Sequence, residues 1–253
     1  MISYRYISRA GLILAIVLAS LLTVLAPVCA QPAPDCVLDR CENKAAPVAA
    51  EGAPERAFRR PSPAGEFDFY LLSLSWSPGF CATGGAEKAR EQCQSGMGLG
   101  FVVHGLWPQF ERGFPSDCDT AGRPVSKVAL ESARGVFPSE GLARYEWRKH
   151  GSCTGRSAQD YFADVRAARD LVRIPPEFER LRQEEDVAPA EILRSFGKAN
   201  PRLRAGMASV TCAKGYLQEV RICLSRDLRE FRPCPEVTRN SCRAQSIKVT
   251  PSL

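Results

Sequence analysis

Residues 101–108 read Phe-Val-Val-His-Gly-Leu-Trp-Pro, and residues 145–153 read Tyr-Glu-Trp-Arg-Lys-His-Gly-Ser-Cys. The first stretch begins as an apolar strand, and the second has the pattern of a short helix that stops at a glycine. They contain the only two histidines of the 253-residue chain, His104 and His150. Because histidine both gives and takes a proton near neutral pH, the pair can supply a general acid and a general base.

The pattern outward from these stretches predicts a mixed fold. Residues 67–75 and 99–105 are short aromatic and aliphatic runs typical of buried strands. Apolar residues at helical spacing then alternate with further strand-like runs, which suggests one α+β domain. The predicted helices cover 127–134, 142–150, 158–172 (with Ser157 as its cap) and 188–196, and the later strands cover 208–212 and 216–224.

The N-terminal 30 residues have the features of a secretory signal. Arg5 and Arg9 precede the apolar stretch 10–26, and Val28-Cys29-Ala30 offers small residues for cleavage. A retained membrane anchor is the alternative, since the apolar stretch is about as long as the shortest spanning helices, roughly 17 residues; a lipoprotein attached at Cys29 is a weaker one. We expect an exported protein, periplasmic or extracellular, whose Pro- and Ala-rich residues 31–66 form a flexible linker before a folded domain at 67–253.

Ten of the eleven cysteines remain once residues 1–30 are removed. An even number in an exported chain favours disulfides over free thiols. Zinc is the competing interpretation, but the sequence has no Cys-x-x-Cys pair and no paired-histidine spacing. We therefore expect no metal and no cofactor.

The charge balance is weakly informative. The whole chain carries +6, and loss of Arg5 and Arg9 lowers this to +4. A slightly basic surface suits an anionic partner, yet it is ordinary for an exported protein and does not by itself indicate nucleic acid.

The chemistry available to the two histidine segments is more specific. His104 is predicted at the end of a strand, where its side chain can enter a cleft. Glu146 lies four residues before His150, so we expect it on the same helix face, where it would orient His150 and raise its pKa. Lys149 could neutralise an anion in a transition state.

Two imidazoles, a carboxylate and a cation suffice for cleavage of RNA by internal transfer. A base takes the proton of the ribose 2′-hydroxyl, the oxygen attacks the adjacent phosphorus, and an acid protonates the departing 5′-oxygen. Since the nucleophile is the 2′-hydroxyl, RNA would be cut and DNA would not.

The same segments resemble the T2 ribonucleases. His-Gly-Leu-Trp-Pro at 104–108 is similar to the family's first active-site segment, and Glu-Trp-Arg-Lys-His-Gly-Ser-Cys at 146–153 to its second. Residues 67–81 and 215–223 resemble the family's first and late strands, so the resemblance covers roughly 67–242. It implies a single α+β domain with a central, mainly antiparallel sheet flanked by helices and stabilised by disulfides.

The resemblance also implies roles. His104 would be the acid and His150 the base, the two exchanging roles when the 2′,3′-cyclic phosphate is hydrolysed to a 3′-phosphate end, while Glu146 and Lys149 support the pentacoordinate phosphorus. Many members carry a third, phosphate-binding histidine where this chain has Tyr145, which can still donate a hydrogen bond but is neutral at pH 7.

Aromatic residues near the motifs have two interpretations. Trp147 is expected in the core. Trp107, with Gln109 and Phe110, could instead frame an RNA base by stacking and hydrogen bonding.

The resemblance implies four disulfides, and arithmetic adds a fifth. The four are Cys81–Cys93, Cys118–Cys153, Cys212–Cys242 and Cys223–Cys234; Cys36–Cys41 follows by exclusion.

The prediction is thus a metal-independent endoribonuclease acting on single-stranded RNA, monomeric and free of the membrane after loss of the signal. The alternative from another class is an exported, disulfide-rich binding protein that keeps the fold with impaired catalysis, and a metal-dependent nuclease or phosphodiesterase is a weaker enzyme alternative.

Overall fold

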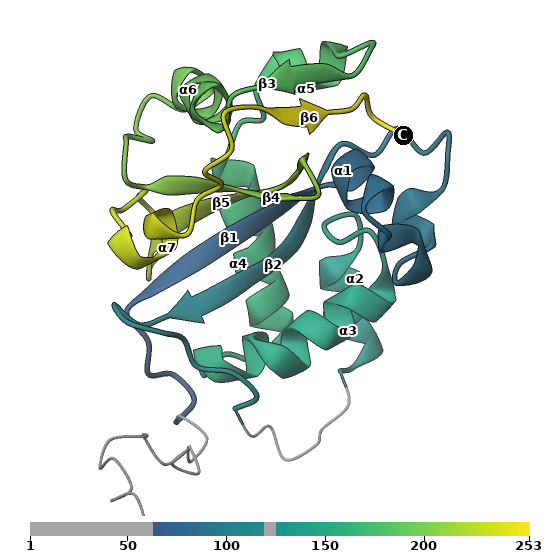
Figure 1. Ribbon diagram of the computed structural model, residues 1–253. Helices are drawn as coiled ribbons and strands as arrows, with labels where there is room; N and C mark the ends of the chain where they lie inside the picture. Colours follow the sequence, from purple (N-terminus) through teal and green to yellow (C-terminus); the bar gives the residue numbers. More distant parts are fainter. Residues whose placement is uncertain (1–62, 119–124) are drawn as a thin grey trace, which may run out of the picture. The chain divides into compact units, whose positions relative to one another are not determined.

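A six-stranded sheet forms the centre of the protein (Figure 1), as seen in a computed structural model that describes residues 63–118 and 125–253. The strand order is β2-β1-β5-β6-β3, with β4 paired to β5, and every pair is antiparallel except β5 with β6. The predicted α+β fold with a mainly antiparallel sheet is confirmed. The strands are β1 (Phe69–Trp76), β2 (Phe101–Gln109), β3 (Glu185–Val187), β4 (Ala208–Ala213), β5 (Tyr216–Ser225) and β6 (Ile247–Val249).

Helices and short helical turns connect the strands. Three helices begin at a serine, Ser126, Ser139 or Ser157, whose side-chain oxygen accepts a hydrogen bond from a backbone N–H of the first turn. The predicted Ser157 cap is therefore confirmed. The helices are α1 (Ser77–Ala82), α2 (Lys127–Ala133), α3 (Glu140–Lys149), α4 (Ala158–Leu171), α5 (Pro176–Arg180), α6 (Pro189–Ala199) and α7 (Pro235–Arg239).

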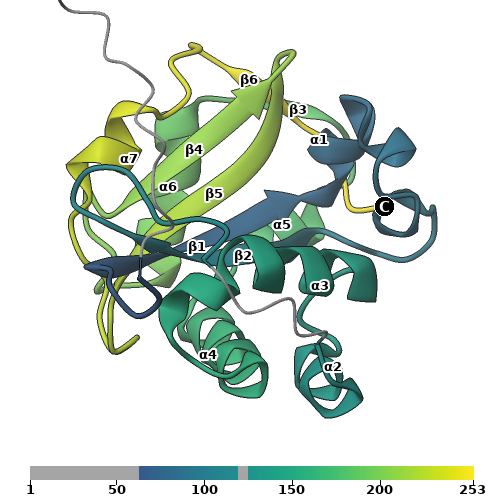
Figure 2. The same cartoon turned by 90° about the horizontal axis from the view of Figure 1, so that it is seen from below.

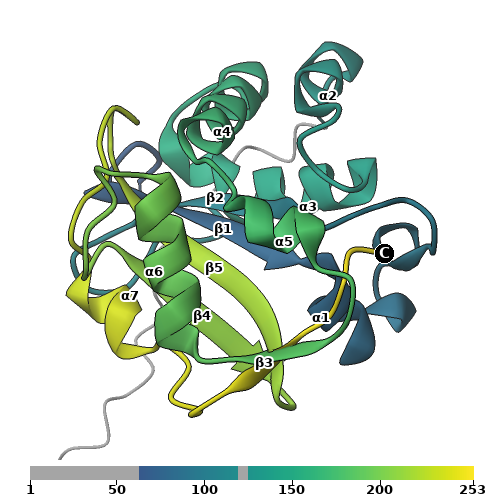
Figure 3. The same cartoon turned by 90° about the horizontal axis from the view of Figure 1, so that it is seen from above.

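The two faces of the sheet differ in chemistry because side chains alternate along each strand. On one face, the apolar residues of β1 and β5 pack beneath α4 and its buried Tyr161 and Phe162. The helix α6 covers the same face farther along, and it lies in front of β4 and β5 in Figure 3 and behind them in Figure 2. The apolar residues of this face are Tyr70, Leu72, Leu74, Trp76, Val220, Ile222 and Leu224.

The opposite face carries Ser73 and Ser75 of β1 beside Arg221 and Glu219 of β5, to which they are paired. We call these four residues the polar face. Both serines are buried, and their small side chains leave room for longer groups to meet above β1.

The strand β2 differs from the prediction, which ended it at Gly105. It continues through Pro108 to Gln109, because β2 is an edge strand whose outer backbone groups need no partner and so tolerates proline. The register shifts between Ser73, paired with Gly105, and Leu74, paired with Val103. His104 is thus the extra residue of a β-bulge inside the strand rather than its last residue.

Four disulfides tie the described chain together: Cys81–Cys93, Cys118–Cys153, Cys212–Cys242 and Cys223–Cys234. They are the four pairs that the resemblance implied. Cys36, Cys41, the signal and most of the linker lie outside the described residues. Within residues 63–118 and 125–253, no helix has the length and apolar character needed to cross a bilayer.

Candidate active site

His104 lies between two carboxylates. The bulge directs its side chain over the polar face, where Nδ1 is 2.5 Å from Oε1 of Glu219. Its other ring nitrogen, Nε2, is 3.7 Å from Oε1 of Glu146 on α3. One imidazole is therefore held on both sides by acids from different elements.

Sequence reasoning did not identify Glu219 as a site residue. Arg221, two positions along β5, donates to Oε2 of Glu219 from Nε at 2.8 Å and Nη2 at 2.7 Å. The available signal was the pattern Glu-x-Arg inside a mostly apolar strand, because residues two apart in a strand share a face. A buried acid beside a cation on one face of a core strand indicates residues that act together in a site.

Glu146 is also buried, with 1% of its surface exposed, and it contacts the β2 segment. The indole nitrogen of Trp107 donates to its Oε2 at 2.7 Å. Gly105 makes this approach possible, since a Cβ there would lie 2.2 Å from both Glu146 Oε2 and Trp107 Nε1.

The expected pairing of Glu146 with the His150 side chain is wrong. The helix α3 ends at Lys149, and His150 is its C-cap with a non-helical φ of −128°. The same-face argument for positions four apart requires helical geometry at both residues, and His150 lacks it. Glu146 therefore orients the other histidine.

His150 instead lies among aromatic rings. The Trp107 ring centroid is 5.2 Å from its imidazole, and that of Phe114 is 6.4 Å away. Its Nδ1 is buried without a hydrogen-bond partner among the described residues. Trp107 is also 5.2 Å from the imidazole of His104, edge to face, so its indole stands beside both histidines.

The pKa values of the two histidines are shifted in opposite directions. Burial lowers the pKa of His104, but the hydrogen bond and charge of Glu219, together with the charge of Glu146, outweigh burial and raise it above its ordinary value. Burial, followed by the charges of Lys149 and His104, lowers the pKa of His150 to about 4. The expectation of a raised pKa at His150 is thus wrong as well.

The two acids also differ. Burial raises the pKa of Glu146 to about 7, against the opposing influences of His104 and Trp107. Burial would raise that of Glu219 too, but the hydrogen bond and charge of His104, with the charge and hydrogen bond of Arg221, lower it to about 2. Glu219 is consequently the more acidic of the two carboxyl groups beside His104.

A cavity of about 390 Å³ opens beside His150. Trp107, Gln109, Phe110 and Lys149, all named from the sequence, line it, whereas Tyr145 is exposed on α3 and does not. The further lining residues, which sequence reasoning missed, are Phe69, Leu71, Gly113, Phe114, Arg221, Glu236, Val237 and Asn240. Trp147 packs in the core, as expected.

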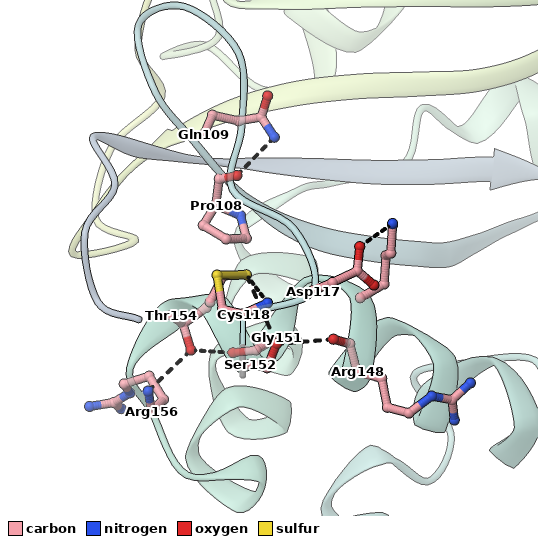
Figure 4. Close-up of a disulfide and its surroundings, with 11 residues drawn as sticks. Pro108, Gln109, Asp117, Cys118, Arg148, Gly151, Ser152, Thr154 and Arg156 are labelled. Atoms are coloured by element: carbon pink, nitrogen blue, oxygen red, sulfur yellow. Dashed lines mark hydrogen bonds and ion pairs between the residues drawn. A yellow bond between two sulfur atoms is a disulfide. The ribbon is translucent and has the colours of Figure 1, made fainter. Parts of the chain in front are cut away.

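The ammonium group of Lys149 forms an ion pair with Asp117, whose side chain is labelled near the disulfide in Figure 4. The backbone N–H of Asp117 also donates to the carbonyl of Lys149 at 2.9 Å. The neighbouring disulfide Cys118–Cys153 fastens this loop to the turn that follows His150. The described residues contain no group of three or more His, Cys, Asp or Glu side chains suited to a metal ion.

Comparison with known proteins gives a consistent picture. The model of the Ribonuclease T2 family matches residues 67–234. A ribonuclease of Aeromonas hydrophila is 48% identical over 110 residues, which are 42% of this chain and 48% of that protein. A probable ribonuclease of Haemophilus influenzae is 36% identical over 120 residues, 43% of this chain and 44% of that protein. The matches thus span about half the length of these two relatives.

Solved structures show the same fold. RNase NT in complex with 5′-AMP superposes with a TM-score of 0.59 at 20% identity and covers 74% of this chain and all of its own. An RNase-related protein from Calystegia sepium gives a TM-score of 0.56 at 21% identity, covering 73% of this chain and 98% of its own.

Proposed function

This chain belongs to the ribonuclease T2 family, and from that premise we propose that it is an endoribonuclease that cleaves single-stranded RNA without a metal ion. Cleavage proceeds by transfer to the 2′-hydroxyl, through a 2′,3′-cyclic phosphate, to 3′-phosphate ends. The observation that carries the proposal is a pair of imidazoles, each 5.2 Å from the Trp107 ring, whose pKa values are shifted in opposite directions.

This difference in pKa supports the assignment of His150 as the general base and His104 as the general acid. At neutral pH the lowered pKa keeps His150 unprotonated, as a general base must be when it takes the 2′-hydroxyl proton. The raised pKa of His104 favours the protonated form, as a general acid needs in order to protonate the departing 5′-oxygen. In the hydrolysis step the two exchange roles.

Binding of the phosphate and bases is assigned to the cavity. Lys149 faces it and would contribute positive charge to the pentacoordinate phosphorus once Asp117 is displaced. Trp107, Gln109 and Phe110 offer stacking surface and hydrogen bonds for a base. Tyr145, one turn before Lys149, is exposed and does not line this cavity, so any hydrogen bond from its hydroxyl to a phosphate would be made outside it. Glu146 acts through its contact with His104.

The setting of the enzyme is part of the same proposal. Residues 1–30 are a cleaved signal, 31–66 a linker and 67–253 the catalytic domain of an exported, monomeric protein. The four disulfides are consistent with an oxidising compartment.

The test is incubation of the purified protein with RNA in EDTA, followed by analysis of the fragment ends. We expect 2′,3′-cyclic phosphate ends, and their loss in His104→Ala and His150→Ala. Cleavage that EDTA abolishes would favour a metal enzyme, and binding of RNA without any cleavage would favour the binding protein that keeps the fold.

A further inference from the structure

The environment of His104 contains a closed ring of contacts. Glu219 holds Nδ1 of His104, Glu146 lies near Nε2, and Trp107 donates to Glu146. Arg221 completes the ring, since its guanidinium lies 5.3 Å from the Trp107 ring and binds Glu219 through two nitrogens.

Each contact in the ring constrains His104 differently. A hydrogen bond at Nδ1 requires a proton there, because the Glu219 carboxylate can only accept. When one proton leaves the imidazolium, it must therefore be the one on Nε2, the nitrogen that faces away from Glu219. Arg221 occupies the other oxygen of Glu219, so the carboxylate cannot turn away from His104.

From this geometry we propose that Glu219 is a positioning residue, which fixes the tautomer and orientation of His104 and directs the transferable proton to Nε2. Glu219 is buried, and its two carboxylate oxygens are occupied by His104 and Arg221, so it acts through His104 and not on substrate. This inference rests on the proposed ribonuclease function for its kinetic consequences but not for its structural ones.

The charged groups that influence the pKa of His104 come from strand β5 and from the region of helix α3. Glu219 and Arg221 come from β5, Glu146 from α3, and His150 follows α3. Of these, Glu219 alone makes a direct hydrogen bond to the ring, and its charge raises the pKa of His104 against burial. Replacing this carboxylate by an amide would leave Glu146 and burial in place, so the pKa of His104 would fall.

The decisive measurement uses the presence of only two histidines in the chain. In protein labelled with ¹⁵N at histidine, long-range ¹H–¹⁵N spectra give two sets of ring signals, which His150→Ala assigns. We expect His104 to carry its proton on Nδ1 in the neutral form, and Glu219→Gln to move the His104 titration to lower pH while that of His150 changes little. An unmoved His104 titration would overturn the proposal.

Enzyme kinetics provide a second test of the role of Glu219. The upper limb of the pH profile of kcat/KM follows the acid, so Glu219→Gln should move this limb to lower pH and reduce kcat at pH 7 on the order of 100-fold, with KM nearly unchanged. Glu219→Asp retains the charge and should restore the limb in part. The matched control is Glu185→Gln, an exposed position on β3, which should leave both readings as they are.

Failures of the two proposals can be told apart. If wild-type protein cuts no RNA while the NMR titrations behave as described, the ribonuclease function fails and the positioning role stands. If Glu219→Gln does not fold, Glu219→Asp and the wild type still decide. The wild-type His104 should show a downfield Nδ1 proton protected from solvent, and its absence would contradict the hydrogen bond on which the inference rests.

Discussion

His104 is surrounded by carboxylate groups, whereas His150 is surrounded by aromatic rings. His104 stands over the polar face, with a charged partner at one nitrogen and a buried acid near the other. His150 stands at a helix end beside Trp107 and Phe114, and its Nδ1 has no partner among the described residues. The difference teaches that the pKa of a partly buried histidine rises or falls according to whether carboxylates or apolar rings surround it.

The largest expected effect comes from filling the space that Gly105 leaves beside His104. Gly105→Val would push Glu146 and Trp107 aside and misplace the acid, so we expect kcat on RNA to fall on the order of 1000-fold. Gly141→Ala on α3 is the matched control, since the nearest atom to its new Cβ is 3.8 Å away, and it should be silent. Wild-type kcat in a folded Gly105→Val protein would refute the crowding argument.

Loss of the disulfide that holds the His150 side should come next. The double variant Cys118→Ser/Cys153→Ser opens a link between residues 35 apart, which corresponds to about 4 kcal/mol of unfolding free energy. Chemical denaturation measures the loss, and NMR should show His150 signals disturbed more than those of His104. Cys81→Ser/Cys93→Ser, with a separation of 12, is the control and should disturb neither histidine.

The two histidines should make the free energy of unfolding change with pH in opposite directions. His150 has a folded pKa of about 4 against 6.5, so the unfolded chain binds its proton first and stability falls as pH falls from 6.5 to 4, by at most about 3 kcal/mol. His104 has a raised folded pKa, so its contribution is complete below pH 6.5 and is lost as pH rises through the folded pKa.

Urea unfolding across this range should separate the two slopes. Subtracting the curve of His150→Asn from that of wild type should isolate the acid slope, and subtracting His104→Asn the alkaline one. Two differences of the same sign would break the comparison between the histidines.

The smallest expected effect concerns the ion pair on the His150 side. Asp117→Asn frees Lys149 for phosphate, and because an exposed pair contributes up to about 1 kcal/mol, KM for RNA should fall by up to about fivefold with kcat unchanged. The gain should shrink at high salt. Asp186→Asn on exposed β3 is the control, and a rise in KM for Asp117→Asn would contradict competition between Asp117 and phosphate.

Periodicity in the sequence predicted the long elements well. The strands β1, β4 and β5 and the helices α2, α3, α4 and α6 fall within a few residues of their predicted ranges. It did not predict α1, α5, α7, β3 or β6, because these have three to six residues and are too short to show a hydrophobic period.

The site was predictable at its motifs and not at its connections. Both histidines, Glu146 and Lys149 stand in the quoted segments, but which acid meets which imidazole depends on a bulge at His104 and on the end of α3 at Lys149. Neither the bulge nor the helix end alters the hydrophobic pattern of the sequence, so that pattern could not predict them. The contribution of Glu219 depends on strand pairing across β1, which brings together residues more than 100 positions apart.

The position of Trp107 has an optical consequence. Of the three tryptophans, Trp76 and Trp147 are buried in the core, while Trp107 lies beside both imidazoles and lines the cavity. A protonated imidazole quenches indole emission, so the fluorescence of Trp107 reports the charge of its neighbours and the arrival of a stacked base. The protein therefore contains its own light-emitting probe, which would follow protonation and binding in real time without any added label.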